Sequence, residues 1–231
     1  MKQFFITGTG TDIGKTLITA GISALASDNN LTSAVMKPVQ TGTDEYQTDY
    51  NFVENLVPEI AHLPESVSQP YKFKLPASPH LAAAQEKKEI DPDYIKQQYI
   101  HSLSYPYDIL LVEGAGGVMV PVTEHYLMID LMKDFDIPVI LVTDAGLGTI
   151  NHTLLSIEAL KSRDIEIAGL IFNRMPGCTD VIAEDNVRII SKLAQVPLLA
   201  CIKTFSEPVT FDSLVNEFKK HDKLKNILFE N

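Results

Sequence analysis

An α/β fold with a mostly parallel central sheet and helices on both faces is the fold class that this sequence predicts. Short apolar runs alternate along the chain with amphipathic, helix-like stretches, which is the pattern of consecutive βαβ units. Several runs are apolar almost throughout, such as residues 109–112 and 139–142, as expected of strands that helices cover on both faces. The length of 231 residues and the 45% hydrophobic content suit one continuous core, so we expect residues 1–231 to form a single domain.

The apolar runs and helical stretches place the individual elements. The first strand is marked by Phe4, Phe5 and Ile6, and six strands are expected in all, at residues 3–7, 33–38, 108–113, 138–143, 166–173 and 197–202. Eight helices are expected, at residues 15–27, 48–57, 80–88, 92–102, 127–134, 151–163, 181–194 and 211–219. Residues 63–79 contain four prolines and are expected to form an ordered loop instead of an element.

Residues 8–16, with the sequence GTGTDIGKT, connect the first strand to the first helix and predict a phosphate-binding loop. Glycines let backbone N–H groups turn inward around phosphate oxygens, and the helix N-terminus adds a partial positive charge. Lys15 would reach the outer phosphates, and the Thr16 hydroxyl would hold Mg²⁺. The first glycine, Gly8, lies one residue earlier than the common spacing, and a plain strand-to-helix turn is the alternative. The loop predicts a P-loop NTPase-like fold.

Other polar residues follow the strands at the same edge of the sheet, where ligands bind in open parallel sheets. Glu113 ends the third strand and is followed by Gly114, Ala115 and Gly116. An acid at this place in nucleotide hydrolases binds magnesium, directly or through water, opposite the hydroxyl of the phosphate loop. The alternative is an ordinary strand end with a solvated carboxylate.

Lys37 ends the second strand, where a lysine is unusual unless something anionic faces it. It would be a second cation beside Lys15, suited to the charge that develops on a transferred phosphoryl group. Thr41 could hydrogen-bond to a polar substrate. Alternatively, the long stem of Lys37 takes its ammonium to solvent. An exposed lysine would contribute little to the core, so Lys37→Ala is expected to fold normally and to lose turnover.

Two further segments are less specific. Asp49 could add a carboxylate to the metal, but from the residues alone a solvated helix start is favoured. Residues 146–152, with the sequence GLGTINH, form another glycine turn that opens a helix and could bind an anion. His152 is expected to be a helix-start residue whose polar groups the backbone satisfies.

Composition excludes several classes of function. The formal net charge of −11 argues against nonspecific nucleic-acid binding. Cys178 and Cys201 have no metal-ligand spacing and are too few for a disulfide framework, so a reducing cytoplasm is expected. No apolar stretch approaches the roughly 20 residues that cross a bilayer. Residues 1–3 lead directly into the first strand, so we expect no signal peptide.

Five blocks together resemble the dethiobiotin synthetase family over roughly the first three quarters of the chain. They occur in the family's order, and the early glycine of the phosphate loop also resembles this family. The blocks are residues 7–16, 37–42, 78–80, 112–117 and 146–152.

The resemblance implies ATP-dependent carboxylation and ring closure of diaminopelargonic acid with CO₂ or bicarbonate. The products would be dethiobiotin, ADP and phosphate, formed through a carbamate and a carbamic–phosphoric anhydride. Family members are homodimers, in which the turn that opens at Gly148 would lie near the dimer boundary. The helix N-terminus there could receive the distal carboxylate of the substrate from the neighbouring subunit.

The resemblance also assigns roles to residues. Lys37 and Lys15 would be catalytic, with Lys37 the family's catalytic lysine. Mg²⁺ would be bound by Thr16, Asp49 and Glu113, and the substrate by Thr41, Gly148 and Asn151. ATP, the co-substrate, would be bound by Asp12, Ile13, Gly14, Lys15, Thr16, Leu17, Glu113, Gly114, Ala115, Gly116, Asn173, Arg174, Lys203, Thr204 and Phe205.

Two departures from the family pattern fall in the expected base pocket. The pair Asn173-Arg174 stands where the family often has Asn-Asp, and residues 203–205 replace a proline-containing segment. Nucleotide preference is therefore the least defined part of the assignment.

Two other classes of protein are weaker alternatives. Partition-type ATPases share the general fold but carry an extra lysine early in the loop, and residues 8–12 contain none. A GTPase switch would need the sequence Asn-Lys-x-Asp, and residues 173–176 lack its acid.

Overall fold

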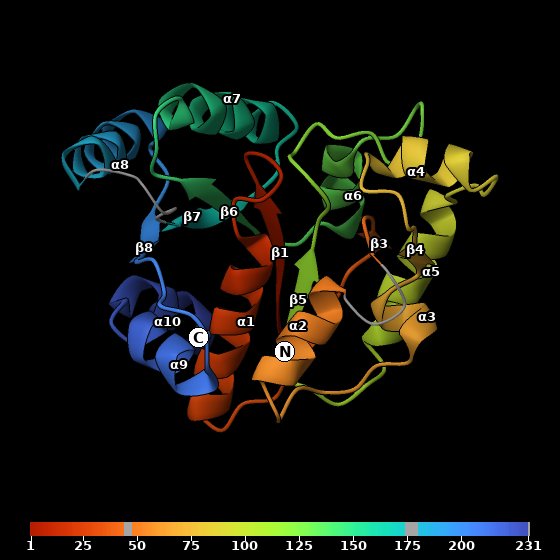
Figure 1. Ribbon diagram of the computed structural model, residues 1–231, viewed down its shortest axis with the longest axis horizontal. Coiled ribbons are helices and arrows are strands. Elements are labelled where there is room, and N and C mark those ends of the chain that lie inside the picture. The colour runs from red at the N-terminus through yellow and green to blue at the C-terminus, as the bar shows by residue number, and fades with distance from the viewer. Residues whose placement is uncertain (44–47, 174–179, 231) are drawn as a thin grey trace.

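The centre of the molecule is a parallel six-stranded sheet with the strand order β2-β5-β1-β6-β7-β8 (Figure 1). The computed structural model describes residues 1–43, 48–173 and 180–230. Every strand pair in this sheet is parallel, so the carboxyl ends of all six strands lie at one edge. The strands are β1 Lys2–Gly8, β2 Ser33–Met36, β5 Ile109–Glu113, β6 Val139–Asp144, β7 Ile167–Asn173 and β8 Leu198–Ile202.

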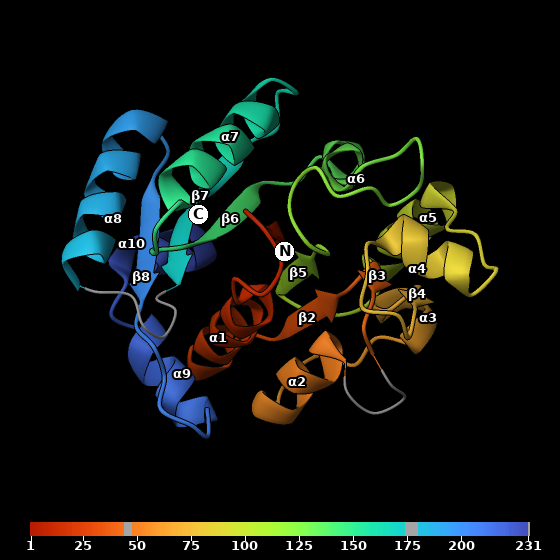
Figure 2. The ribbon, with the colours of Figure 1, turned by 45° about the horizontal axis from the view of Figure 1, so that its top comes forward.

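The strands are apolar on both faces because each face packs on its own layer of helices (Figure 2). Phe4 and Phe5 are neighbours in β1 and belong to different core clusters, since successive side chains of a strand point to opposite faces. One face packs against α1 Lys15–Asp28, α2 Asp49–Leu56, α9 Phe211–Phe218 and α10 Asp222–Phe229. The cluster on the other face includes residues of α3 Glu65–Ser68, α4 Pro79–Gln85, α5 Pro92–Ser102, α6 Met128–Phe135, α7 Thr149–Lys161 and α8 Asp180–Ala194.

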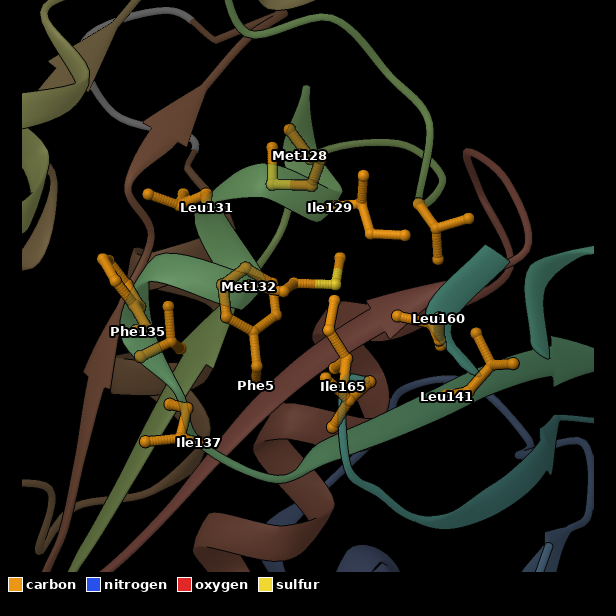
Figure 3. Close-up of a cluster of buried hydrophobic side chains, with 14 of the residues drawn as sticks. Phe5, Met128, Ile129, Leu131, Met132, Phe135, Ile137, Leu141, Leu160 and Ile165 are labelled. Atoms are coloured by element: carbon orange, nitrogen blue, oxygen red, sulfur yellow. The ribbon is translucent and has the colours of Figure 1, made fainter. Parts of the chain in front are cut away.

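Helix α6 shows how the second face is filled (Figure 3). Its apolar residues Met128, Leu131 and Met132 are at most 1% exposed and belong to the same cluster as Phe5 of β1. The ring of Phe135 stacks on Tyr99 of α5 at a centroid distance of 4.1 Å. The helix therefore joins the sheet to its outer layer, and a cavity left by Met132→Ala would cost about 2–5 kcal/mol.

The predicted fold class is confirmed, and so are all six strands and eight helices, with ends that differ by at most three residues. The prediction of a loop over residues 63–79 is wrong in part. The short helix α3 and the strand β4 Tyr71–Lys72 lie in this segment, and β4 pairs with β3 Val39–Gln40, which the sequence did not predict. Pro64 caps the start of α3, so the prolines of this segment border its elements instead of preventing them. Helix α10 was also missed.

The strand order determines which residues meet at the carboxyl edge. Strand β5 lies between β1 and β2, and Ile6 pairs with Glu113 while Met36 pairs with Val112. The residue after Met36 therefore faces the end of β5, and the loop after β1 lies on its other side. In the described part of the chain, no helix is both long and apolar enough to cross a membrane.

Candidate active site

The loop of residues 8–16 runs from the end of β1 at Gly8 to the start of α1 at Lys15. Gly14, the N-cap of α1, has φ +89°, and a Cβ there would lie 2.1 Å from Nδ2 of Asn173. A Cβ on Gly8 would lie 2.2 Å from Cδ1 of Ile13, so the early glycine allows the loop to fold back over the strand. The predicted strand–loop–helix context of a phosphate-binding loop is present.

Lys15 is buried beneath this loop, and its Nζ donates to the carbonyl of Gly10 at 2.8 Å. Burial lowers the pKa of Lys15 to about 8, and the positive charge of Lys37 adds to the effect. An anion beside Lys15 would relieve both penalties. The ammonium is therefore ready to interact with a phosphate.

Glu113 is 1% exposed, so the solvated alternative is wrong. Its Oε1 accepts from the Thr16 hydroxyl at 2.8 Å, and its Oε2 accepts from the Thr19 hydroxyl at 2.8 Å. Thr19 lies one helical turn after Lys15 and was missed, because a threonine inside a helix carries no signal of its own in the sequence. The two hydroxyls of α1 fix the carboxylate against the phosphate-binding loop.

Lys37 is only 4% exposed, which overturns the expectation of an exposed lysine that contributes little to the core. Its Nζ lies 2.6 Å from Oδ2 of Asp49 and 2.7 Å from Oε1 of Glu113, and it also donates to the carbonyl of Gly114 at 3.2 Å. Burial alone would lower the pKa of Lys37, but Glu113 and Asp49 outweigh it and raise the pKa above its usual value. Lys37 is therefore held as a cation.

Asp49 is the first residue of α2, and its carboxylate contacts Lys37. The expectation of a solvated helix start is therefore wrong. Partial burial would raise the pKa of Asp49, but Lys37 and hydrogen bonds with Thr16 and Gln40 lower it. Oε1 of Gln40 also accepts the backbone N–H of Asp49 at 3.2 Å. Gln40 joins β3 to α2, and it was not predicted to be a site residue although it lies in the recognised block of residues 37–42.

Thr16, Asp49 and Glu113 together offer a hydroxyl and two carboxylates beside the loop. These hard oxygen donors fit Mg²⁺, which usually takes one or two carboxylates, phosphate oxygens and waters. Among the described residues, no three His, Cys, Asp or Glu side chains form a metal-binding group. Magnesium at this place would complete its ligands with waters and phosphate oxygens.

These groups open into a cavity of about 720 Å³. Predicted residues Asp12, Thr41, Ala115 and Gly116 line it together with Lys15, Lys37 and Glu113. Other residues that line the cavity were not predicted to be site residues, although four of them belong to recognised blocks. They include Gln40, Gly42, Pro76, Ala77, Ser78, Pro79 and Val120.

The predicted base-pocket residues that the structure describes, Asn173 and residues 203–205, do not line this cavity. Asn173 is buried, and its Nδ2 donates to the carbonyl of Ile13 at 3.0 Å, so it supports the phosphate-binding loop. The N–H of Lys203 donates to Glu217 at 3.1 Å, while Thr204 is exposed and Phe205 is half-buried. Arg174 and Cys178 lie outside the described residues. Leu17, in the first turn of α1, is half-buried.

Gly148 and Asn151 line a different hollow of about 590 Å³, on the exposed side of α7. Within one chain, the structure thus separates these two predicted substrate residues from Thr41. Leu147 and Leu155 in the same region are 95% and 61% exposed. His152 is also exposed, in the first turn of the helix.

Comparisons with known proteins agree with this geometry. A family model described as "AAA domain" matches residues 2–208. The ATP-dependent dethiobiotin synthetase BioD of Halalkalibacterium halodurans is 38% identical over 211 residues, which are 87% of this chain and 84% of that protein. The protein of the same name from Bacillus subtilis is 32% identical over 99% of this chain and 98% of its own length.

This chain belongs to the dethiobiotin synthetase family. The resemblance drawn from five sequence blocks is thereby confirmed over nearly the whole chain, including the region after residue 152. Lys37, Asp49, Glu113 and the phosphate-binding loop meet in one cavity of this family member.

Solved structures outside the dethiobiotin synthetase family share the fold. A ParA family ATPase from Chlorobium tepidum matches with a TM-score of 0.57 at 15% identity, over 98% of this chain and 96% of that one. The MinC:MinD cell division protein complex of Aquifex aeolicus matches with a TM-score of 0.56 at 17% identity, over 99% and 93%. At these identities the likeness shows the fold alone, and the P-loop NTPase-like prediction is confirmed.

Proposed function

We propose that this protein uses ATP to carboxylate diaminopelargonic acid and close its cyclic urea, giving dethiobiotin, ADP and phosphate. The observation that carries the proposal is the buried ammonium of Lys37 in the same cavity as the phosphate-binding loop. A partition-type ATPase would carry its second lysine early in the loop, whereas here the second cation comes from the end of β2, where it can face a carbamate as well as the transferred phosphoryl group. Membership of the dethiobiotin synthetase family supports the same reaction.

The chemistry starts with a carbamate formed from one substrate amine and CO₂. A carbamate is a poor acyl donor, and transfer of the γ-phosphoryl group of ATP to a carbamate oxygen supplies a leaving group. The second amine then attacks the carbamate carbon, the ring closes, and phosphate leaves with the carbamate oxygen. Phosphoryl transfer depends on positioning and charge stabilisation, so the protein needs no covalent intermediate.

Lys15 and Lys37 are the catalytic cations in this proposal. Lys15 would hold phosphate oxygens from beneath the loop, and Lys37 would stabilise the negative charge of the carbamate and of the transferred group. Thr41 and Ser78 lie on the cavity wall, where hydroxyls can bind the polar end of the substrate.

Magnesium would be held by Thr16, Asp49, Glu113 and the phosphates, and would neutralise charge between the β- and γ-phosphoryl groups. Because Glu113 is fixed by Thr16 and Thr19, its carboxylate needs little reorganisation to bind a cation. Asp49 lies 2.6 Å from Lys37, so this carboxylate would serve both cations.

The adenine is assigned to residues 173–174 and 203–205 by resemblance, and Asn173 would act partly by supporting the loop. The exposed Leu147 and Leu155 beside the hollow of Gly148 and Asn151 support a homodimer. In that dimer, the helix N-terminus of α7 would receive the substrate carboxylate from the neighbouring subunit. We place the enzyme in the cytoplasm, with no nucleic-acid or membrane partner.

The test is phosphate release from ATP with Mg²⁺ and bicarbonate, with and without diaminopelargonic acid, while dethiobiotin is followed by mass. Release that depends on the diamine and matches the dethiobiotin formed supports the ligase. Release that is independent of the diamine and yields no dethiobiotin would replace the ligase with a switch ATPase.

A further inference from the structure

Asn186 is a buried amide on α8 whose hydrogen bonds go to the turn before α7. It is 7% exposed, and its Nδ2 donates to the carbonyl of Ala145 at 3.0 Å and to that of Gly146 at 2.9 Å. One side chain thus satisfies two consecutive carbonyls of a turn that lies about 40 residues away in the sequence. The carbonyl of Gly146 also accepts the N–H of Thr149 at 3.3 Å.

These bonds also set the direction of a backbone donor. A trans peptide is planar, and its C=O and N–H point in opposite directions. Because the carbonyl of Gly146 points to α8, the N–H of Leu147 in the same peptide points away from it. Among the described residues, the N–H of Leu147 has no hydrogen-bond acceptor.

A cluster of threonine hydroxyls anchors the other side of the turn. Oγ1 of Thr143 lies 2.8 Å from that of Thr149 and 2.7 Å from that of Thr153, and Thr149 also donates to the carbonyl of Asp144 at 2.9 Å. A carboxylate oxygen of Asp144 accepts the N–H of Gly146 at 3.1 Å. The turn is therefore held from α8, from β6 and from α7.

We infer that Asn186 is a positioning residue for recognition of the substrate carboxylate. By fixing the carbonyls of Ala145 and Gly146 toward α8, it keeps the N–H of Leu147, just before the first turn of α7, directed away from α8, where the carboxylate would bind. This inference rests on the proposed function, in which the N-terminus of α7 receives that carboxylate. Asn186 acts through the backbone and does not itself touch the substrate.

The test compares Asn186→Leu, which keeps the number of side-chain heavy atoms and removes both donors, with Asn29→Leu as a matched control. Asn29 follows α1, and its Nδ2 donates to the carbonyl of Leu25 at 2.8 Å, away from the turn. For Asn186→Leu we expect the KM for diaminopelargonic acid to rise about tenfold, while kcat and the KM for ATP change less than about twofold. Asn29→Leu should leave all three constants near those of the wild type.

A second ligand separates carboxylate recognition from general damage. In 2,3-diaminononane a methyl group replaces the carboxylate, so its Kd, measured by calorimetry, should be the same for Asn186→Leu and the wild type. The Kd of diaminopelargonic acid should rise about tenfold. Equal weakening of both ligands, an unchanged Kd for the acid, or parallel losses in kcat and ATP binding would overturn the role of Asn186.

If Asn186→Leu does not fold, Asn186→Gln keeps the amide but displaces it by one methylene, and the KM for the acid should rise several-fold. An unchanged KM in that variant would equally overturn the inference. Failure of the proposed function is a separate result, because the wild-type protein would then form no dethiobiotin.

Discussion

The ammonium of Lys37 lies 2.7 Å from the carboxylate of Glu113, and these residues are 4% and 1% exposed. They come from the ends of adjacent strands, β2 and β5, so the register of the sheet brings them together. A buried ion pair costs desolvation energy, and breaking it leaves an uncompensated buried charge. The pair therefore makes the proposed catalytic lysine part of the folded structure as well.

Replacement of Lys37 should affect stability and turnover together. Lys37→Ala removes the charge that faces Glu113 and Asp49, so we expect unfolding to become easier by about 3 kcal/mol. Turnover should fall by about a thousandfold or more, because a cation that stabilises the transition state is lost. Urea titration and phosphate release measure the two effects. Lys37→Arg, which keeps the charge, should recover most stability, and full activity in folded Lys37→Ala would remove Lys37 from the mechanism.

Glu113→Gln should weaken the response to magnesium. The amide keeps one acceptor oxygen for Thr16 or Thr19 and carries no charge for a divalent cation, so the Mg²⁺ concentration at half-maximal rate should rise about tenfold or more. Binding of Mn²⁺ with ATP, followed by paramagnetic resonance, should weaken in parallel. An unchanged magnesium titration would show that Glu113 is not a ligand.

ATP binding should weaken as the pH rises through about 8. Burial and Lys37 lower the pKa of Lys15 to about 8, so its ammonium is charged below this pH and neutral above it. Phosphates bind the charged form and raise its pKa, so ATP binding must take up a proton above pH 8. The Kd of a non-hydrolysable ATP analogue should therefore stay constant from about pH 6.5 to 7.5. Above pH 8 it should rise by up to about tenfold per pH unit.

Lys15→Arg provides the control for this pH dependence, because a guanidinium stays charged over the whole range. For this variant, the Kd of the ATP analogue should not change with pH above 8, even if the Kd itself differs from that of the wild type. Equal slopes in the two proteins would assign the pH dependence to another group.

Gly21 of α1 packs directly against Phe218 of α9. An added Cβ would lie 2.0 Å from the ring, which is fully buried, so Gly21→Ala should lower stability by about 1–3 kcal/mol. The double variant with Phe218→Leu should regain part of the loss. Thermal melts with Gly10→Ala as a control test this, since a Cβ at Gly10 meets nothing within 4 Å. If Gly21→Ala leaves the melting temperature unchanged, α9 must move to accommodate the added methyl group without loss of stability.

Strong local patterns explain why most of the fold could be predicted. Strands such as Ile109–Glu113 are apolar up to their last residue, and the start of α5 is marked by Asp91, whose side chain caps it, and Pro92. The two-residue strands β3 and β4 have no comparable signal. They form because Val39 pairs with Tyr71 across more than thirty residues, a contact that depends on tertiary packing.

The candidate site was predictable where a residue type is unusual for its position, as with Lys37 at the end of a buried strand. Thr19, Gln40 and Asn186 were missed because polar residues on helices and short strands are common. Their importance comes from partners far away in the sequence, such as Glu113 for Thr19 and Ala145 for Asn186. The burial of Lys37 was also missed, since the two carboxylates that make it possible come from β5 and α2.

The most direct test of the account follows oxygen from carbon dioxide to phosphate. With ¹⁸O-labelled CO₂, ATP and diaminopelargonic acid, mixed quickly enough to limit exchange with water, both carbamate oxygens carry the label. Phosphate that leaves from a carbamic–phosphoric anhydride should then contain one labelled oxygen and match the dethiobiotin formed, one for one. Unlabelled phosphate, or phosphate without dethiobiotin, would contradict the proposed reaction.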